Sequence, residues 1–144
     1  MSVKKTIAFV CLHGSAKSLI AAEYLSRLAR ERGLELSATT SGPEPDAEVP
    51  ENVIEGMLRR GIDARARHPV RVTAAAPARA DLIVSFGCDL RSLAPPDAVI
   101  ERWDDCPAVS DDFDIAWSFI TGHVEQLVGR LTSRHLDGKS GGRP

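Results

Sequence analysis

The sequence predicts a single α/β domain built on a mostly parallel sheet. Two uninterrupted apolar runs, residues 6–12 and 81–87, have the β-branched and aromatic content of strands that are buried on both faces. Amphipathic helical segments alternate with the strands, which is the arrangement that parallel sheets require. The predicted order along the chain is strand, helix, strand, helix, strand, strand, helix.

The first strand leads directly into a helix. Residues 6–12 are followed by small side chains, and a helical pattern then covers about residues 17–32, with Ile20 and Leu25 on its apolar side. Gly33 lies just past this segment, where a left-handed cap is expected to end the helix.

A second strand and a second helix follow. Residues 35–41 form the predicted strand, and a turn that begins with Gly42 and Pro43 closes it. The helix is expected to begin near Pro50 and to stop at Gly61.

Two strands and a long helix complete the domain. Residues 81–87 form the second buried strand, and residues 98–103 form a shorter one. The last helix is expected over about residues 111–134, where apolar side chains recur at helical spacing, with Ser110 as its N-cap. Residues 1–136 should therefore make one domain, and the tail 137–144, which has no apolar anchor, should be disordered.

The composition excludes several functional classes. Eighteen Lys and Arg residues against twenty Asp and Glu residues, with a formal net charge of -2, give no basic face for a nucleic acid. No segment approaches the roughly 20 apolar residues that a membrane span needs. The apolar run near the N-terminus is too short for a signal peptide because His13 and Lys17 interrupt it, so a cytoplasmic protein is expected.

The cysteines are an odd set, Cys11, Cys88 and Cys106, without a Cys-x-x-Cys pair. This pattern does not resemble a secreted disulfide framework, so each thiol serves either packing or chemistry. No His, Cys and carboxylate cluster has the spacing of a metal site, and no bound metal is expected.

The loop after the first strand is the main candidate for chemistry. Its small residues allow the backbone to approach a bound group, and the N–H groups and dipole of the following helix favour an anion. Cys11 stands at the start of the loop, where the same field and the charge of Lys17 stabilise a thiolate. The sequence predicts a thiolate nucleophile beside an oxyanion cradle formed by Leu12, His13, Gly14, Ser15, Ala16 and Lys17.

Two other interpretations of this loop exist. Ala16-Lys17-Ser18 imitates the end of a nucleotide-binding P-loop, but Cys11 and Ala16 occupy the positions of its two required glycines. In the simpler alternative, Cys11 packs at the end of a strand and Lys17 begins a solvated helix.

Further motifs along the chain carry a family resemblance. The loop reads Cys-x5-basic-Ser, residues 40–45 read TSGPEP, residues 61–69 read GIDARARHP, and residues 81–88 read DLIVSFGC. In this order they resemble the low-molecular-weight protein tyrosine phosphatase superfamily, and the segment 81–88 is similar to its thiol-dependent arsenate reductase branch. The resemblance implies a flavodoxin-like three-layer sandwich, in which a four-stranded parallel sheet lies between helices on both faces.

The resemblance also implies roles for individual residues. Cys11 matches the nucleophile, Gly14 to Lys17 match the oxyanion-binding loop, and Ser18 matches the hydroxyl that hydrogen-bonds the thiolate. Asp105 is the best match to the general acid, and Asp104 is the alternative.

The acid position is one of several departures from the family pattern. Cys106, not an aspartate, directly precedes Pro107, and Ala108 and Val109 occupy the region where an aromatic usually helps to hold a phosphotyrosine ring. Lys17 replaces the usual arginine, so the bidentate clamp on a phosphoryl transition state is missing. Gly14 replaces the usual asparagine, which should make the loop less preorganised.

Two enzymatic chemistries follow from the resemblance. In an arsenate reductase, Cys11 attacks arsenate and a second thiol releases arsenite; Cys88 aligns with the first resolving cysteine, while Pro95 occupies the position of the next one. Cys106, or a thiol reductant such as thioredoxin, a glutaredoxin-type protein or a small-molecule thiol, would then complete the cycle. In a phosphatase, Cys11 attacks a phosphomonoester and Asp105 protonates the leaving oxygen.

The missing aromatic and the match at Cys88 favour the arsenate reductase interpretation. A catalytically weakened protein that binds phosphate or arsenate, or a regulatory one, is the other alternative, because Lys17 replaces arginine. No tightly bound cofactor is implied.

Overall fold

A computed structural model describes residues 5–73, 79–90 and 92–139. The elements follow the predicted order: β1 (Lys5–Val10), α1 (Lys17–Arg32), β2 (Leu36–Ser41), α2 (Glu51–Leu58), β3 (Leu82–Ser85), β4 (Ile100–Arg102) and α4 (Phe113–Lys139). The strands form one parallel four-stranded sheet in the order β2-β1-β3-β4. The predicted α/β fold is thus confirmed.

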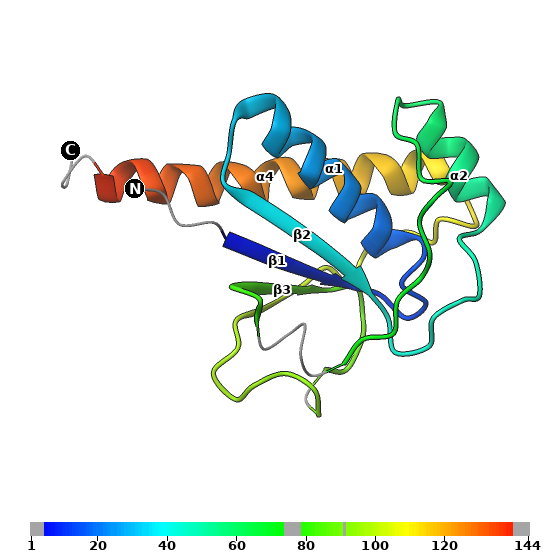
Figure 1. The fold of residues 1–144 in the computed structure, drawn as a ribbon, viewed down its shortest axis with the longest axis horizontal. Helices are drawn as coiled ribbons and strands as arrows, with labels where there is room; N and C mark the ends of the chain where they lie inside the picture. The colour runs from blue at the N-terminus through cyan, green and yellow to red at the C-terminus, as the bar shows by residue number, and fades with distance from the viewer. Residues whose placement is uncertain (1–4, 74–78, 91, 140–144) are drawn as a thin grey trace.

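One face of the sheet carries the helices α1, α2 and α4 (Figure 1). Ile7 and Phe9 of β1 point to this face and join a core that includes Leu25 of α1, Met57 of α2 and Ile120 of α4. Because alternate residues of a strand face opposite sides, the last four residues of β1, Ile7 to Val10, are all apolar and buried, while Lys5 at the start of the strand is exposed.

The opposite face has a smaller core. Ala8, Val10 and Ile83 contact Val72 and Leu90, which lie in the connections before and after β3. Between Val72 and β3, residues 74–78 fall outside the described part of the chain.

The sheet register brings several loops to one edge. Val10, the last residue of β1, pairs with Ser41 of β2 and Ser85 of β3, and Ser85 pairs with Arg102 of β4. All of the strands therefore end at one level, and the segments that follow them meet at the carboxyl edge, where ligands bind in open parallel sheets.

The last helix differs from its prediction at both ends. Asp112 caps α4, because its Oδ1 accepts a hydrogen bond from the backbone N–H of Ile115 at 3.1 Å, so the expected cap at Ser110 is wrong. The helix continues to Lys139, past Asp137, where a disordered tail was expected to begin. Once a helix has formed, each further residue adds one backbone hydrogen bond, which offsets the weak propensity of this segment; residues 140–144 lie outside the described chain.

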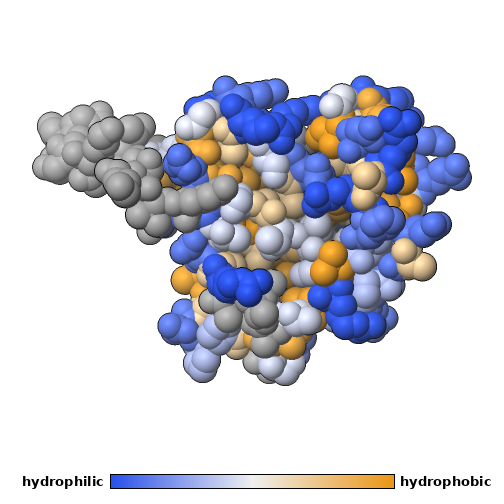
Figure 2. Space-filling model, viewed as in Figure 1, coloured by the Kyte–Doolittle hydropathy of each residue, from blue (hydrophilic) through white to orange (hydrophobic). Residues whose placement is uncertain are grey.

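Hydrophilic side chains predominate on the face shown in Figure 2, and apolar ones are scattered between them. Of the helices that the structure describes, none combines the length and the apolar character needed to cross a bilayer.

Candidate active site

Cys11 lies at the edge of the sheet, between the end of β1 and the start of α1. Its side chain is buried, with 6% of the residue exposed. The hydroxyl oxygen of Ser18 lies 3.1 Å from Cys11 Sγ, and the backbone N–H of Ser18 donates to the same sulfur at 3.4 Å. The hydroxyl and the backbone N–H of Ser18, in the first turn of α1, thus both lie within hydrogen-bond distance of the sulfur.

Ser18 is itself held by the neighbouring strand. Its hydroxyl lies 2.7 Å from the hydroxyl of Thr40 in β2. If Ser18 donates to a thiolate, Thr40 donates to Ser18, so the hydrogen bonds form a chain from Thr40 through Ser18 to Cys11.

The start of α1 is suited to an anion. Its N-cap residue, Ala16, makes no side-chain cap, and its first turn carries no acidic residue. The positive end of the helix dipole and the N–H groups of the first turn therefore remain directed at the loop.

The loop needs glycine at two contacts. Gly14 has φ +61°, and a Cβ at this position would lie 2.8 Å from the backbone nitrogen of Gly42. A Cβ on Gly42 would lie 2.4 Å from the carbonyl oxygen of Cys11. The turn after β2 therefore packs directly on the Cys11 loop, backbone against backbone.

The segment after β2 also makes polar contacts with the loop. The N–H of Glu44 donates to the Leu12 carbonyl at 2.9 Å, and the N–H of Asp46 donates to the His13 carbonyl at 3.3 Å. The Asp46 carboxylate accepts a hydrogen bond from Ser15 Oγ at 2.7 Å. The loop is consequently bound along its length to residues 42–46.

A cavity of about 300 Å³ opens over Cys11. Residues 11–17, except Gly14, line it, together with residues 108–110 of the segment before α4. The lining residues are Cys11, Leu12, His13, Ser15, Ala16, Lys17, Asp46, Pro50, Asn52, Val53, Phe86, Ala108, Val109 and Ser110. The cavity therefore joins the predicted nucleophile, the predicted cradle and one lysine in a single site.

The predicted acids, Asp105 and Asp104, are not among the described lining residues. Asp105 is exposed on the segment after β4, and Asp104 is bound to Arg102 at 3.0 Å. Among the described residues, the segment contributes Ala108, Val109 and Ser110 to the cavity but neither aspartate.

Cys88 and Cys106 are both buried near the site. Burial raises the pKa of the Cys88 thiol to about 11, and the negative charge of Cys11 acts in the same direction, while Arg102 and Lys17 oppose it. Burial likewise raises the pKa of Cys106 to about 11, with Lys17 lowering it and Cys11 raising it. Both thiols are therefore neutral at physiological pH, within electrostatic range of Cys11.

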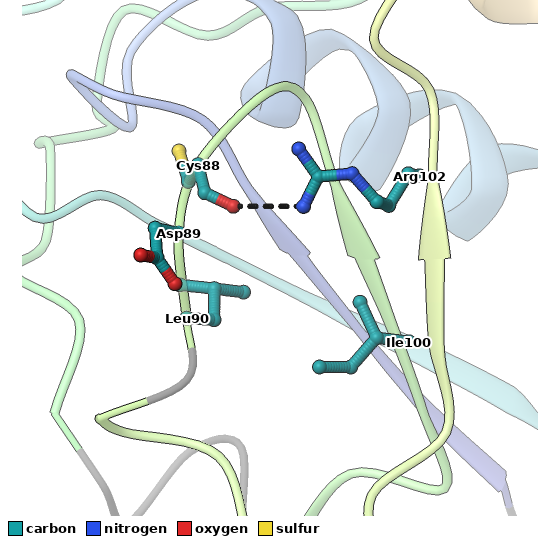
Figure 3. A pocket seen from close by; sticks show the side chains of 5 residues that line it. All are labelled: Cys88, Asp89, Leu90, Ile100 and Arg102. Carbon is teal, nitrogen blue, oxygen red and sulfur yellow. Dashed lines mark hydrogen bonds between the residues drawn. The ribbon is translucent and has the colours of Figure 1, made fainter.

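The two thiols lie on different sides of the sheet. Cys106 belongs to the same core as Cys11, whereas Cys88 belongs to the core of the opposite face. Cys88 lines a second cavity of about 310 Å³ with Asp89, Leu90, Ile100 and Arg102 (Figure 3). Arg102 donates to the Cys88 carbonyl at 3.3 Å, and Figure 3 shows the sulfur on the side away from the guanidinium.

The structure adds residues that the sequence did not single out as functional. Thr40, Asp46 and Asn52 reach the site from β2, from the turn after it and from α2. The sequence does show polar residues at the end of β2 and shortly after it. Only the pairing of β1 with β2, however, shows that these residues lie beside the Cys11 loop.

Sequence comparisons show which known proteins this chain is similar to. The family model of the low molecular weight phosphotyrosine protein phosphatases matches residues 6–97. A putative arsenate reductase of Halobacterium salinarum is 28% identical over 97 residues, which cover 66% of this chain and 68% of that protein.

Solved structures share the fold. A low molecular weight protein tyrosine phosphatase from T. tengcongensis superposes with a TM-score of 0.81 at 16% identity, covering 88% of this chain and 99% of the other. A thioredoxin-dependent arsenate reductase from Corynebacterium glutamicum has a TM-score of 0.78 at 22% identity, and the match covers 92% of this chain and 64% of that one.

Proposed function

Because this chain belongs to the low molecular weight phosphotyrosine protein phosphatase family, we propose that it is a cysteine-thiolate enzyme acting on a tetrahedral oxyanion, with arsenate as the substrate. The observation that carries the proposal is the buried Cys11 sulfur, which accepts a hydrogen bond from the backbone N–H of Ser18 and lies 3.1 Å from the Ser18 hydroxyl oxygen, at the uncapped start of α1. The similarity to a putative arsenate reductase and the absence of an aromatic residue at Ala108 support arsenate over a phosphotyrosine.

In the first step the Cys11 thiolate attacks arsenic. A sulfur–arsenic bond forms, and one arsenic–oxygen bond breaks as a hydroxyl group of arsenate takes up a proton and departs as water. The loop N–H groups and Lys17 hold the remaining oxygens, and Ser18 stabilises the thiolate before it attacks.

In the second step a thiol displaces arsenic from Cys11. The two sulfurs form a disulfide and lose two electrons, and arsenic(V) leaves as arsenic(III) in arsenite. Cys88 is the resolving residue that the family resemblance suggests, and Cys106 is the alternative within the core of Cys11. An external thiol, from thioredoxin, a glutaredoxin-type protein or a small molecule, then reduces the disulfide.

The second candidate function is hydrolysis of a phosphomonoester. The family to which the chain belongs favours it, and the cavity over Cys11 is large enough for more than an inorganic ion. In this reaction the assignment of Asp105 as the acid stays a prediction, since Asp105 lies outside the described lining of the cavity.

The deciding experiment compares both reactions in one preparation. Arsenite formation from arsenate is measured with thioredoxin, a glutaredoxin system or a small thiol as the reductant, and hydrolysis of an aryl phosphate is measured in parallel. Wild type and Cys11→Ser are compared, with Cys88→Ser and Cys106→Ser to identify the resolving thiol. We expect thiol-dependent arsenite formation that Cys11→Ser abolishes.

Aryl phosphate turnover without arsenite, lost in Cys11→Ser, would establish the phosphatase instead. If neither reaction occurs while phosphate or arsenate still protects Cys11 from alkylation, the chain is an oxyanion-binding protein, and both enzymatic proposals fail.

A further inference from the structure

A histidine and an aspartate, whose side chains are 50% and 38% exposed, pair at the lining of the cavity over Cys11. His13 Nδ1 lies 2.8 Å from the carbonyl oxygen of Glu44 and 3.5 Å from Asp46 Oδ1. Both His13 and Asp46 line the cavity together with Cys11 and Lys17. The mechanism derived above uses neither the imidazole nor this carboxylate.

The contacts determine which ring nitrogen carries the proton. A carbonyl oxygen only accepts hydrogen bonds, so Nδ1–H of His13 donates to Glu44. In the neutral ring, Nε2 is then the nitrogen that exchanges a proton, as in other sites where a carbonyl or carboxylate orients an imidazole.

Asp46 is fixed in its place beside the ring. Its Oδ2 accepts the hydrogen bond from Ser15, and its backbone N–H donates to the carbonyl of His13. The carboxylate therefore cannot turn away without breaking its hydrogen bond with Ser15, and it compensates the charge when the imidazole is protonated.

We propose that His13, oriented by Glu44 and Asp46, is the proton-carrying group of this cavity and donates a proton to the oxygen that leaves in the reaction. The donation of this proton to the leaving oxygen rests on the proposed function. Asp46 is the positioning residue. The geometry favours His13 over Asp105 and Asp104, since neither aspartate belongs to the described lining and Asp104 already pairs with Arg102.

The proton transfer balances for either substrate. With hydrogen arsenate, the Cys11 sulfur bonds to arsenic, the hydroxyl departs, and the proton from Nε2 of the imidazolium converts it to water. With a phosphomonoester, the same proton converts the leaving alkoxide or phenoxide to the alcohol. In both cases His13 returns to the neutral ring with its proton on Nδ1.

The charges around the ring give the expected pH dependence. The other titratable groups that line the cavity are Cys11 on the loop, Lys17 at the start of α1 and Asp46 after β2. Protonated His13 adds a second positive charge to that of Lys17, so an oxyanion should bind more tightly when the ring is protonated.

The kinetic test compares His13→Gln, Asp46→Asn and Asp105→Asn with wild type in whichever reaction the protein performs. The control is His68→Gln, since His68 is exposed and lies outside the described lining of the cavity. We expect His13→Gln to lower kcat about 10²-fold with little change in KM and to remove one limb of the pH profile. Asp46→Asn should lower the pH at which that limb appears, a change that loss of packing alone would not produce. A loss confined to Asp105→Asn, with His13→Gln like wild type, would overturn the assignment.

A binding test separates this proposal from the proposed function. Sulfate, which stays a dianion from pH 5 to 8, is used to protect Cys11 from iodoacetamide in the wild type and in His13→Gln, and the protection factor is followed with pH. We expect protection to strengthen toward low pH only in the wild type. An identical pH dependence in the two proteins overturns the assignment of His13 even if turnover is found. A difference between them without turnover supports His13 as the proton carrier and refutes the enzyme.

Discussion

Replacing Gly42 with alanine should disrupt the oxyanion loop without altering any side chain of the site. The added Cβ would lie 2.4 Å from the Cys11 carbonyl oxygen, 2.5 Å from the Gly14 nitrogen and 2.7 Å from the Leu12 carbonyl oxygen. All of these are backbone atoms, so no side chain can rotate away. Restoring an ordinary separation of 3.4 Å from the first of them requires a shift of 1.0 Å (3.4 minus 2.4) in the loop or in the turn after β2.

A displacement of that size is large for a catalytic loop. A misplacement of about 1 Å typically costs about 10²-fold in rate, and overpacking costs about 1–3 kcal/mol of stability. We therefore expect Gly42→Ala to lower kcat/KM about 10²-fold, to abolish oxyanion protection of Cys11 from alkylation and to lower Tm.

The matched control is Gly122→Ala in α4. An added Cβ there meets nothing within 4 Å, and alanine should stabilise the helix by about 1 kcal/mol. A Gly42→Ala variant with wild-type protection and an unchanged Tm would show that the contact between the two loops is looser than described, and the account of the cradle would fail.

Further predictions concern the lysine, the buried thiols and the pH dependence of stability. Lys17→Arg should raise aryl phosphate hydrolysis, toward the 10²–10³-fold that one electrostatic donor typically supplies, because guanidinium can hold two oxygens; a lower rate would show that lysine is adapted to this site. Cys88 and Cys106 should react with iodoacetamide about 100-fold more slowly than a thiol with the ordinary pKa of 9.0, since the pKa of each is raised to about 11; peptide mapping of Cys11→Ser checks this, and equal rates before and after denaturation would contradict it. The hydrogen bond with Arg130 lowers the pKa of Glu101 in the folded protein. The ionised carboxylate therefore stabilises the fold at pH values above its ordinary pKa, and this stabilisation is lost as the pH falls through the lowered pKa of the folded state. Glu101→Gln should accordingly cost about 1 kcal/mol in urea unfolding at pH 7 and much less at pH 3, whereas an equal cost at both would exclude an ionic contribution.

The sequence alone predicts the order of elements and the Cys11 loop, because both are local properties. Continuous apolar runs mark β1 and β3, helical periodicity marks α1 and α4, and the loop places Cys11 and Ser18 seven positions apart. Their contact at 3.1 Å requires only that one tight turn join a strand to a helix.

Other features depend on which strands are neighbours. Because β2 pairs with β1, Thr40 reaches Ser18 across 22 positions, and Asp46 reaches Ser15 across 31 positions. The same packing explains why Gly42 is needed, although nothing in its own turn requires a glycine at that contact.

The tertiary structure also separates residues that the motifs would group together. Cys88 follows β3 into the core of the opposite face, while residues 108–110, not Asp105, extend over Cys11. Periodicity along a chain records which residues are buried, but not which carboxyl ends of strands become adjacent. That adjacency arises when the parallel strands align in register, so the nucleophile is evident from the sequence and the polar groups around it are decided by the sheet.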